Sequence, residues 1–67
     1  MKVFATMDSQ KNGSVWVSEF NTKEDAISSA SLQWDRLTFI EKKQRRIVAC
    51  LADTDTLEVW EEFKTFE

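Results

Sequence analysis

The chain has 67 residues, of which 42% are hydrophobic and 31% are charged, and its formal net charge is −3. This composition is that of one small globular domain spanning residues 1–67, and it excludes a mainly disordered chain. The negative charge argues against general affinity for nucleic acids or membranes. A single cysteine excludes an internal disulfide, and no apolar run resembles a signal peptide or a membrane span, so we expect a cytoplasmic protein.

The first 20 residues predict a β-hairpin. Two segments rich in β-branched and aromatic residues, Lys2–Ser9 and Ser14–Phe20, flank Asn12-Gly13, which is the strongest short signal for a tight hairpin turn. We expect a two-residue loop, and that register sets which side chains share a face. The expected core face carries Val3, Ala5, Met7, Trp16 and Phe20. The opposite face carries Phe4, Thr6, Asp8, Val15, Val17 and Glu19.

The segment Thr22–Leu37 predicts the main helix. Thr22 is a suitable N-cap, and Asp25 occupies the position of the reciprocal residue in a capping box. Apolar side chains recur at helical spacing and form one narrow stripe that we expect to cover the sheet. The stripe consists of Ala26, Ile27, Ala30, Trp34 and Leu37.

A second, shorter helix is predicted over Phe39–Arg45. Thr38 and Glu41 are three positions apart and form a second capping box at its start. Leu32 lies opposite the apolar stripe of the main helix. We therefore expect Phe39 or Ile40 to fold back and cover it.

The last third of the chain predicts a second hairpin. Ile47–Ala52 is apolar at every position, which fits a strand covered on both faces, with a buried helix as the alternative. A turn at Asp53–Thr56 separates it from Leu57–Phe66, where β-branched and aromatic residues favour a strand over a helix. The predicted fold is therefore an α+β domain of order ββααββ, with a four-stranded antiparallel sheet and both helices on one face.

A pattern in the central third of the chain resembles one found in small uncharacterised proteins of Gram-positive bacteria and of their phages and mobile elements. The residues that carry it are Phe20–Ile27 (FNTKEDAI), Trp34, Leu37-Thr38 and Glu41-Lys42-Lys43. The resemblance implies an α+β fold with a C-terminal strand. It implies no catalytic activity, and its most concrete functional suggestion is a regulator or inhibitor of a host protein.

The residue inventory argues against an enzyme. The chain has no histidine, so acid–base catalysis by imidazole and nucleophiles paired with histidine are absent. Cys50 lies in an apolar run, and we expect it to be a buried structural residue. Asp53, Asp55 and Glu58 lack the spacing of a calcium-binding loop. We therefore expect no catalytic residue, no metal and no cofactor.

Four cations lie close together at Lys42, Lys43, Arg45 and Arg46, whereas the segment from Asp53 to the end is mostly acidic. The favoured interpretation of this basic run is a solvated face or a partner for the chain's own acidic residues. Contact with nucleic-acid phosphates is one alternative, and docking of an acidic protein is the other. The run itself contains no aromatic residue, which weakens the nucleic-acid interpretation.

Aromatic residues on both faces of the last strand predict a protein interface. If one face of this strand meets the core, Trp60 emerges on the open face of the sheet, and tryptophan is enriched among binding hot spots. The acidic residues of the same strand would extend this surface. The expected interface consists of Phe4, Val15, Val17, Glu58, Trp60, Glu61 and Glu62.

These observations predict a non-enzymatic protein that acts through contact with another protein, whose identity stays open. A homodimer would supplement the small core. The alternative function is an accessory nucleic-acid-binding domain that uses the basic run, Lys42, Lys43, Arg45 and Arg46.

Overall fold

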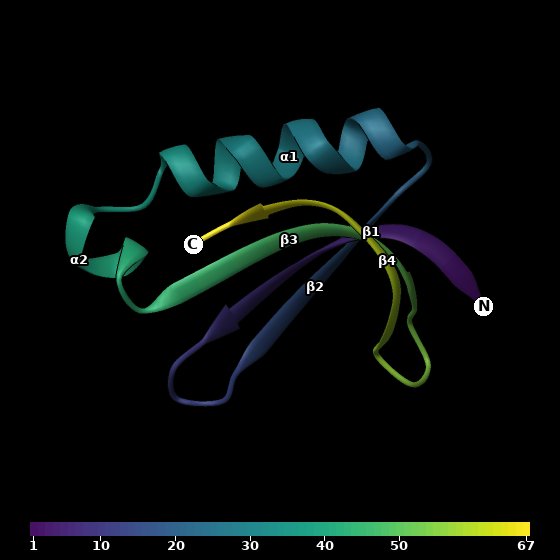
Figure 1. The fold of residues 1–67 in the computed structure, drawn as a ribbon, viewed down its shortest axis with the longest axis horizontal. Coiled ribbons are helices and arrows are strands. Elements are labelled where there is room, and N and C mark those ends of the chain that lie inside the picture. Colours follow the sequence, from purple (N-terminus) through teal and green to yellow (C-terminus); the bar gives the residue numbers. More distant parts are fainter.

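The computed structural model describes all 67 residues and shows an α+β fold with one four-stranded sheet (Figure 1). The elements are β1 (Lys2–Gln10), β2 (Val15–Phe20), α1 (Lys23–Asp35), α2 (Phe39–Lys42), β3 (Arg45–Asp53) and β4 (Glu58–Phe66). The sheet is antiparallel, with strand order β2-β1-β3-β4. The predicted α+β class, the four-stranded sheet and the C-terminal strand are thus confirmed. Neither helix is long and apolar enough to cross a membrane.

Helix α1 lies across one face of the sheet (Figure 1). It begins after Thr22 because the Thr22 Oγ1 accepts a hydrogen bond of 3.1 Å from the backbone N–H of Asp25. The predicted apolar stripe is confirmed: Ala26 and Ala30 are fully buried in one cluster with Ile47 and Ala49 of β3. The other members of the stripe pack around this cluster, together with Phe4, Phe20 and Phe66.

Helix α2 is shorter than predicted and lies past the end of the sheet, beside the start of β3, rather than on the face that α1 covers (Figure 1). Its capping box is complete. The Thr38 Oγ1 accepts from the N–H of Glu41 at 3.2 Å, and the Glu41 Oε1 accepts from the N–H of Thr38 at 3.0 Å. This second hydrogen bond is the main reason that the pKa of Glu41 lies below its ordinary value.

The expected cover over Leu32 is absent. Leu32, Phe39 and Ile40 all remain exposed. The reason is that the chain leaves α2 at once to extend the sheet: β3 starts at Arg45, which pairs with Gln10 of β1. Extension of the sheet thus replaces the last turn of the predicted helix.

Three residues, Lys11, Asn12 and Gly13, connect the hydrogen-bonded pair of Gln10 and Ser14, so the predicted two-residue loop was wrong. The N–H of Gly13 donates to the carbonyl of Gln10 at 3.0 Å, and the N–H of Gln10 donates to the carbonyl of Ser14 at 2.9 Å. Gly13 has a φ of 93°. This combination is a type I turn followed by a left-handed glycine. The additional loop residue shifts the pairing by one position.

This shift moves every β2 side chain to the other face relative to β1. Phe4 and Phe20 are opposite each other and pack beneath α1. The face away from α1 carries Ala5 and Met7 opposite Glu19 and Val17. The predicted core face, which combined Val3, Ala5 and Met7 with Trp16 and Phe20, is therefore corrected.

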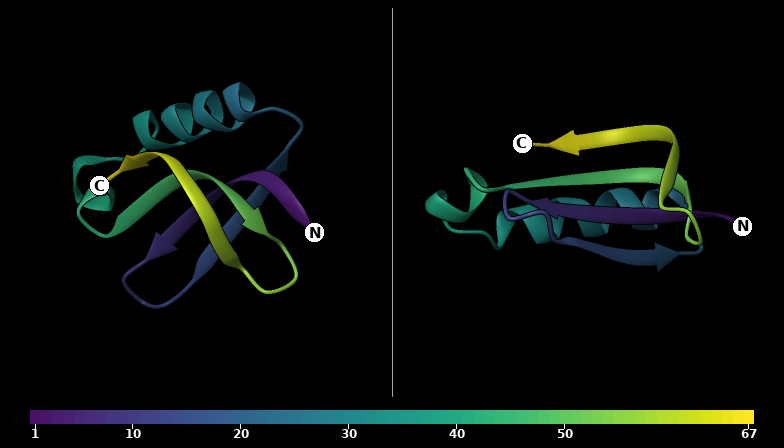
Figure 2. Two further views of the ribbon diagram at one scale, coloured as in Figure 1. Left: turned by 45° about the vertical axis from the view of Figure 1, so that its right-hand side comes forward. Right: turned by 90° about the horizontal axis from the view of Figure 1, so that it is seen from below.

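The face away from α1 has a small core of its own. Its fully buried members are Ala5, Cys50 and Ala52, and Met7 and Val48 are nearly so. The sheet is strongly twisted (Figure 2), and the pairing of β3 with β4 contains two register shifts, which increase local twist. The expected burial of Cys50 is confirmed, and burial raises the pKa of its thiol, with a further contribution from the carboxylate of Glu62.

Asp53 organises the turn between β3 and β4. Its Oδ1 accepts from the N–H of Asp55 at 2.9 Å and from the N–H of Thr56 at 3.3 Å. Its Oδ2 lies 3.3 Å from the amino group of Met1. These contacts hold the pKa of Asp53 below its ordinary value of 3.8, and the hydrogen bond from the N–H of Asp55 has the largest effect. Leu57 completes the turn with a φ of 59°.

Candidate functional site

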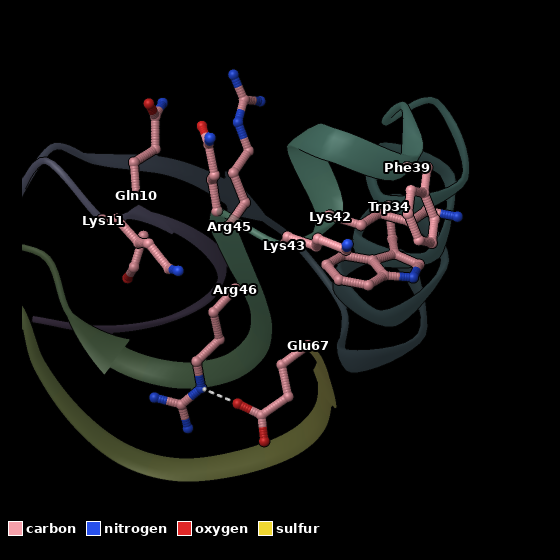
Figure 3. A pocket seen from close by; sticks show the side chains of 11 residues that line it. Gln10, Lys11, Trp34, Phe39, Lys42, Lys43, Arg45, Arg46 and Glu67 are labelled. Carbon is pink, nitrogen blue, oxygen red and sulfur yellow. Dashed lines mark ion pairs between the residues drawn. The ribbon is translucent and has the colours of Figure 1, made fainter.

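An open depression of about 620 Å³ lies where α1, α2, the β1–β2 loop and the ends of β3 and β4 meet (Figure 3). Its lining is unusual for an acidic protein because five of the residues around it are basic. These are Lys11, Lys42, Lys43, Arg45 and Arg46. Two aromatic residues, Trp34 from α1 and Phe39 from α2, also line it.

The two arginines of the depression are bound to the protein's own acidic side chains. Arg45 Nη1 lies 3.4 Å from the Oδ2 of Asp8, and its Nη2 lies 3.8 Å from the Oε2 of Glu41. Arg46 lies 3.3 Å from both the Oε1 of Glu62 and the Oε2 of Glu67, and Figure 3 shows the second pair at the rim. For these two residues the structure shows the intramolecular pairing that the charge pattern favoured.

The three lysines of the depression have no acidic partner within 4.0 Å. The Nζ of Lys43 lies 4.4 Å from the centre of the Phe39 ring, and the Nζ of Lys42 lies 5.6 Å from that of Trp34. Both distances suit cation–π contact. These ammonium groups therefore keep their charge available to an anionic partner.

The fold brings Lys11 to the depression although it is distant in sequence from the other basic residues. It lies in the β1–β2 loop, and its backbone N–H donates to the carbonyl of Gln44 at 3.0 Å. The predicted basic cluster comprised only cations of residues 42–46 and did not include Lys11, Trp34 or Phe39. Lys11 lies there because Arg45, the first residue of β3, pairs with Gln10 at the end of β1 and so brings the loop alongside.

The two aromatic residues differ in how far they are available. The Trp34 ring is partly buried and packs against Phe66 with 6.1 Å between ring centres. Phe39 is 75% exposed. Its neighbour Ile40 is also exposed. The depression thus combines free positive charge with an accessible apolar surface.

The residues predicted to form a protein interface do not form one patch. Phe4 packs against Phe63 beneath α1, with 6.1 Å between ring centres, and so does not lie on the open face. Val15 and Val17 belong to β2, whereas the four predicted residues from Glu58 to Glu62 belong to β4 at the opposite edge of the sheet. Trp60 is 52% exposed, and the Nζ of Lys2 lies 4.0 Å from its ring centre.

The chemical groups of the depression are mainly cationic and aromatic. Its side chains offer ammonium groups, guanidinium groups and aromatic rings to a partner that carries negative charge. No group of three or more acidic or cysteine side chains is arranged to hold a metal ion. Comparison with protein-family models, with curated proteins and with solved structures gave no match.

Proposed function

We propose that this chain is a non-catalytic binding protein that recognises an acidic segment of a protein partner at the basic and aromatic depression. One observation carries the proposal. Three lysines without acidic partners, Lys11, Lys42 and Lys43, surround a depression that also presents the exposed ring of Phe39. An aromatic anchor surrounded by polar groups is typical of the centre of a protein interface.

The amount of free charge favours a protein partner over a nucleic acid. Proteins that bind nucleic acid strongly through the backbone make about six to ten phosphate contacts. Here Arg45 and Arg46 are engaged with carboxylates, which leaves three free lysines around the depression of a molecule whose net charge is −3. Exposed apolar side chains at Phe39 and Ile40 supply the remainder of an interface with a protein.

The test is affinity capture from a host lysate with a set of matched variants. We expect one nuclease-resistant polypeptide to be retained by the wild type and lost with Phe39→Ala and with the double variant Lys42→Glu, Lys43→Glu. Lys23→Glu is the charge control, because Lys23 lies at the start of α1, whereas the depression lies at the other end of this helix. Trp60→Ala is the aromatic control, because Trp60 lies on β4 outside the depression.

The outcomes separate two surfaces. Loss of the polypeptide with Trp60→Ala but not with Phe39→Ala would move the interface to β4 and contradict the proposal. With the purified partner, Phe39→Ala should weaken affinity by at least about tenfold, as expected for an aromatic anchor. A role as a regulator or inhibitor of that partner would follow from the same contact.

A second candidate function is binding of single-stranded nucleic acid at the same depression. The contact between Lys43 and the exposed Phe39 ring favours it, because aromatic rings beside cations form stacking platforms for bases. Titration with a fluorescent oligonucleotide at several salt concentrations tests this function. Binding that weakens steeply with salt and requires Lys42 and Lys43 would support it over the protein partner.

A further inference from the structure

The two edges of the sheet differ in their ability to accept another strand. The β4 edge carries Glu58, Glu61 and Glu62, and its pairing with β3 is interrupted by two register shifts. Charge and bulges are the features by which proteins block edge-to-edge pairing. The β2 edge has a continuous register from Phe20 to Val15, and Glu19 is its only charged residue. We infer that β2 pairs with β2 of a second copy of this chain.

The hydrogen bonds of the first hairpin define which backbone groups of β2 are free. The N–H of Gln10 donates to the carbonyl of Ser14, so this pair is of the hydrogen-bonded type. Such pairs alternate along an antiparallel ladder. Trp16 and Ser18 therefore direct their backbone groups toward β1, whereas Val15, Val17 and Glu19 direct theirs outward.

The outward-pointing backbone groups of β2 must pair with the outward-pointing backbone groups of β2 in the second copy. This requirement restricts the register of a symmetric dimer. One allowed register places Val17 opposite Val17 of the second copy on a twofold axis. It also places Val15 opposite Glu19, and Trp16 opposite Ser18, of the second copy. Both copies of α1 then lie on the same face of one continuous eight-stranded sheet, since residues directly opposite each other share a face.

The side chains on the helix-covered face favour this register. Trp16 is 68% exposed, although it lies beside the core on a sheet face that α1 covers. Ser18 is small and exposed, and a hollow of about 370 Å³ opens beside it, lined also by Gln33 of α1. The large indole of one copy would fill the space beside the small hydroxyl of the other. This fit occurs twice across the axis.

Sedimentation velocity over a dilution series tests the pairing. We expect a reversible dimer for the wild type, and an increase of about tenfold or more in the dissociation constant for Val17→Lys, because two like charges would be directly opposite. Val59→Lys is the matched control, since Val59 is an exposed valine on the β4 edge. Val15→Lys should retain the dimer, because it would oppose Glu19 of the second copy.

A cross-linking experiment tests the register without loading charge on the edge. Val17→Cys should be joined to itself by a short bifunctional thiol reagent, whereas Val59→Cys should not. Cys50 is fully buried and does not compete for the reagent. A wild-type chain that stays monomeric at millimolar concentration, or a dimer lost with Val59→Lys and kept with Val17→Lys, would overturn the inference. Neither position lines the basic depression, so the proposed function is tested separately.

Discussion

Arg45 reaches across the β1–β3 pair and donates a hydrogen bond of 3.4 Å from its Nη1 to the Oδ2 of Asp8. The Asp8 side chain is only 13% exposed, and its second oxygen, Oδ1, is buried without a hydrogen-bond partner. The carboxylate therefore depends on one guanidinium group. Arg45 thus serves the fold as well as the basic depression.

Removal of this guanidinium group should destabilise the protein. We expect Arg45→Ala to lower the free energy of unfolding by about 1–3 kcal/mol, because it leaves a largely buried charge without a partner. Urea denaturation followed by tryptophan fluorescence measures the change. Arg46→Ala is the control: its pairs with Glu62 and Glu67 are exposed, so its loss should cost less than about 1 kcal/mol. Equal effects of the two substitutions would contradict this account.

Gly13→Ala should destabilise the first hairpin through the backbone alone. The φ of Gly13 is 93°, and an added Cβ would meet no atom within 4 Å, so there is room for the methyl group. The left-handed conformation disfavours a side chain by about 1–2 kcal/mol, and the free energy of unfolding should fall by that amount. Urea denaturation measures it. An unchanged midpoint would show that the loop adopts another conformation.

Leu57→Gly should raise the free energy of unfolding, in contrast to Gly13→Ala. Leu57 adopts a φ of 59° and is exposed, so it bears a backbone cost without much burial in return. Glycine relieves that cost but loses conformational freedom on folding, which leaves a net gain of about 0.5–1 kcal/mol in the free energy of unfolding. Thermal and urea denaturation check it. The substitution Thr54→Gly, in the same turn, controls for the general effect of glycine on the unfolded chain.

Stability should fall in acid because of Asp53. Its folded-state pKa lies below the ordinary value of 3.8, so its contribution is present above that value and is lost as pH falls through the folded-state pKa. Urea midpoints measured from neutral pH down to strongly acidic pH will show the effect. Asp53→Asn keeps an oxygen acceptor but does not ionise at that position, so the difference between the two proteins should shrink in acid. A constant difference would contradict the assignment.

Much of the fold was predictable because its signals are local. The N-cap at Thr22, the apolar stripe of α1 and the apolar run of β3 each depend on residues within one element. The register of the first hairpin was not predictable, since Asn12-Gly13 fits both a two-residue and a three-residue loop. Only the observed turn, with Gly13 alone at positive φ in this loop, decides between them.

The candidate site was less predictable than the fold. Lys42 and Lys43 were recognisable as cations, but their availability depends on ion pairs that Arg45 and Arg46 form with residues distant in sequence. Lys11 approaches them only because β3 begins at Arg45 and extends the sheet toward the loop. Long-range pairing of this kind leaves no local trace in composition or spacing.

The position of Cys50 makes its thiol a reporter of how often the sheet opens. The only thiol of the chain lies at the centre of the sheet, on β3, and is fully buried. Burial also raises the pKa of this thiol. Poor access and a small thiolate fraction therefore both slow its reaction with alkylating reagents while the strands stay paired. The rate at which an alkylating reagent modifies the protein therefore reports how often its central strands separate. Mass spectrometry measures that rate on the wild-type chain, without a substitution.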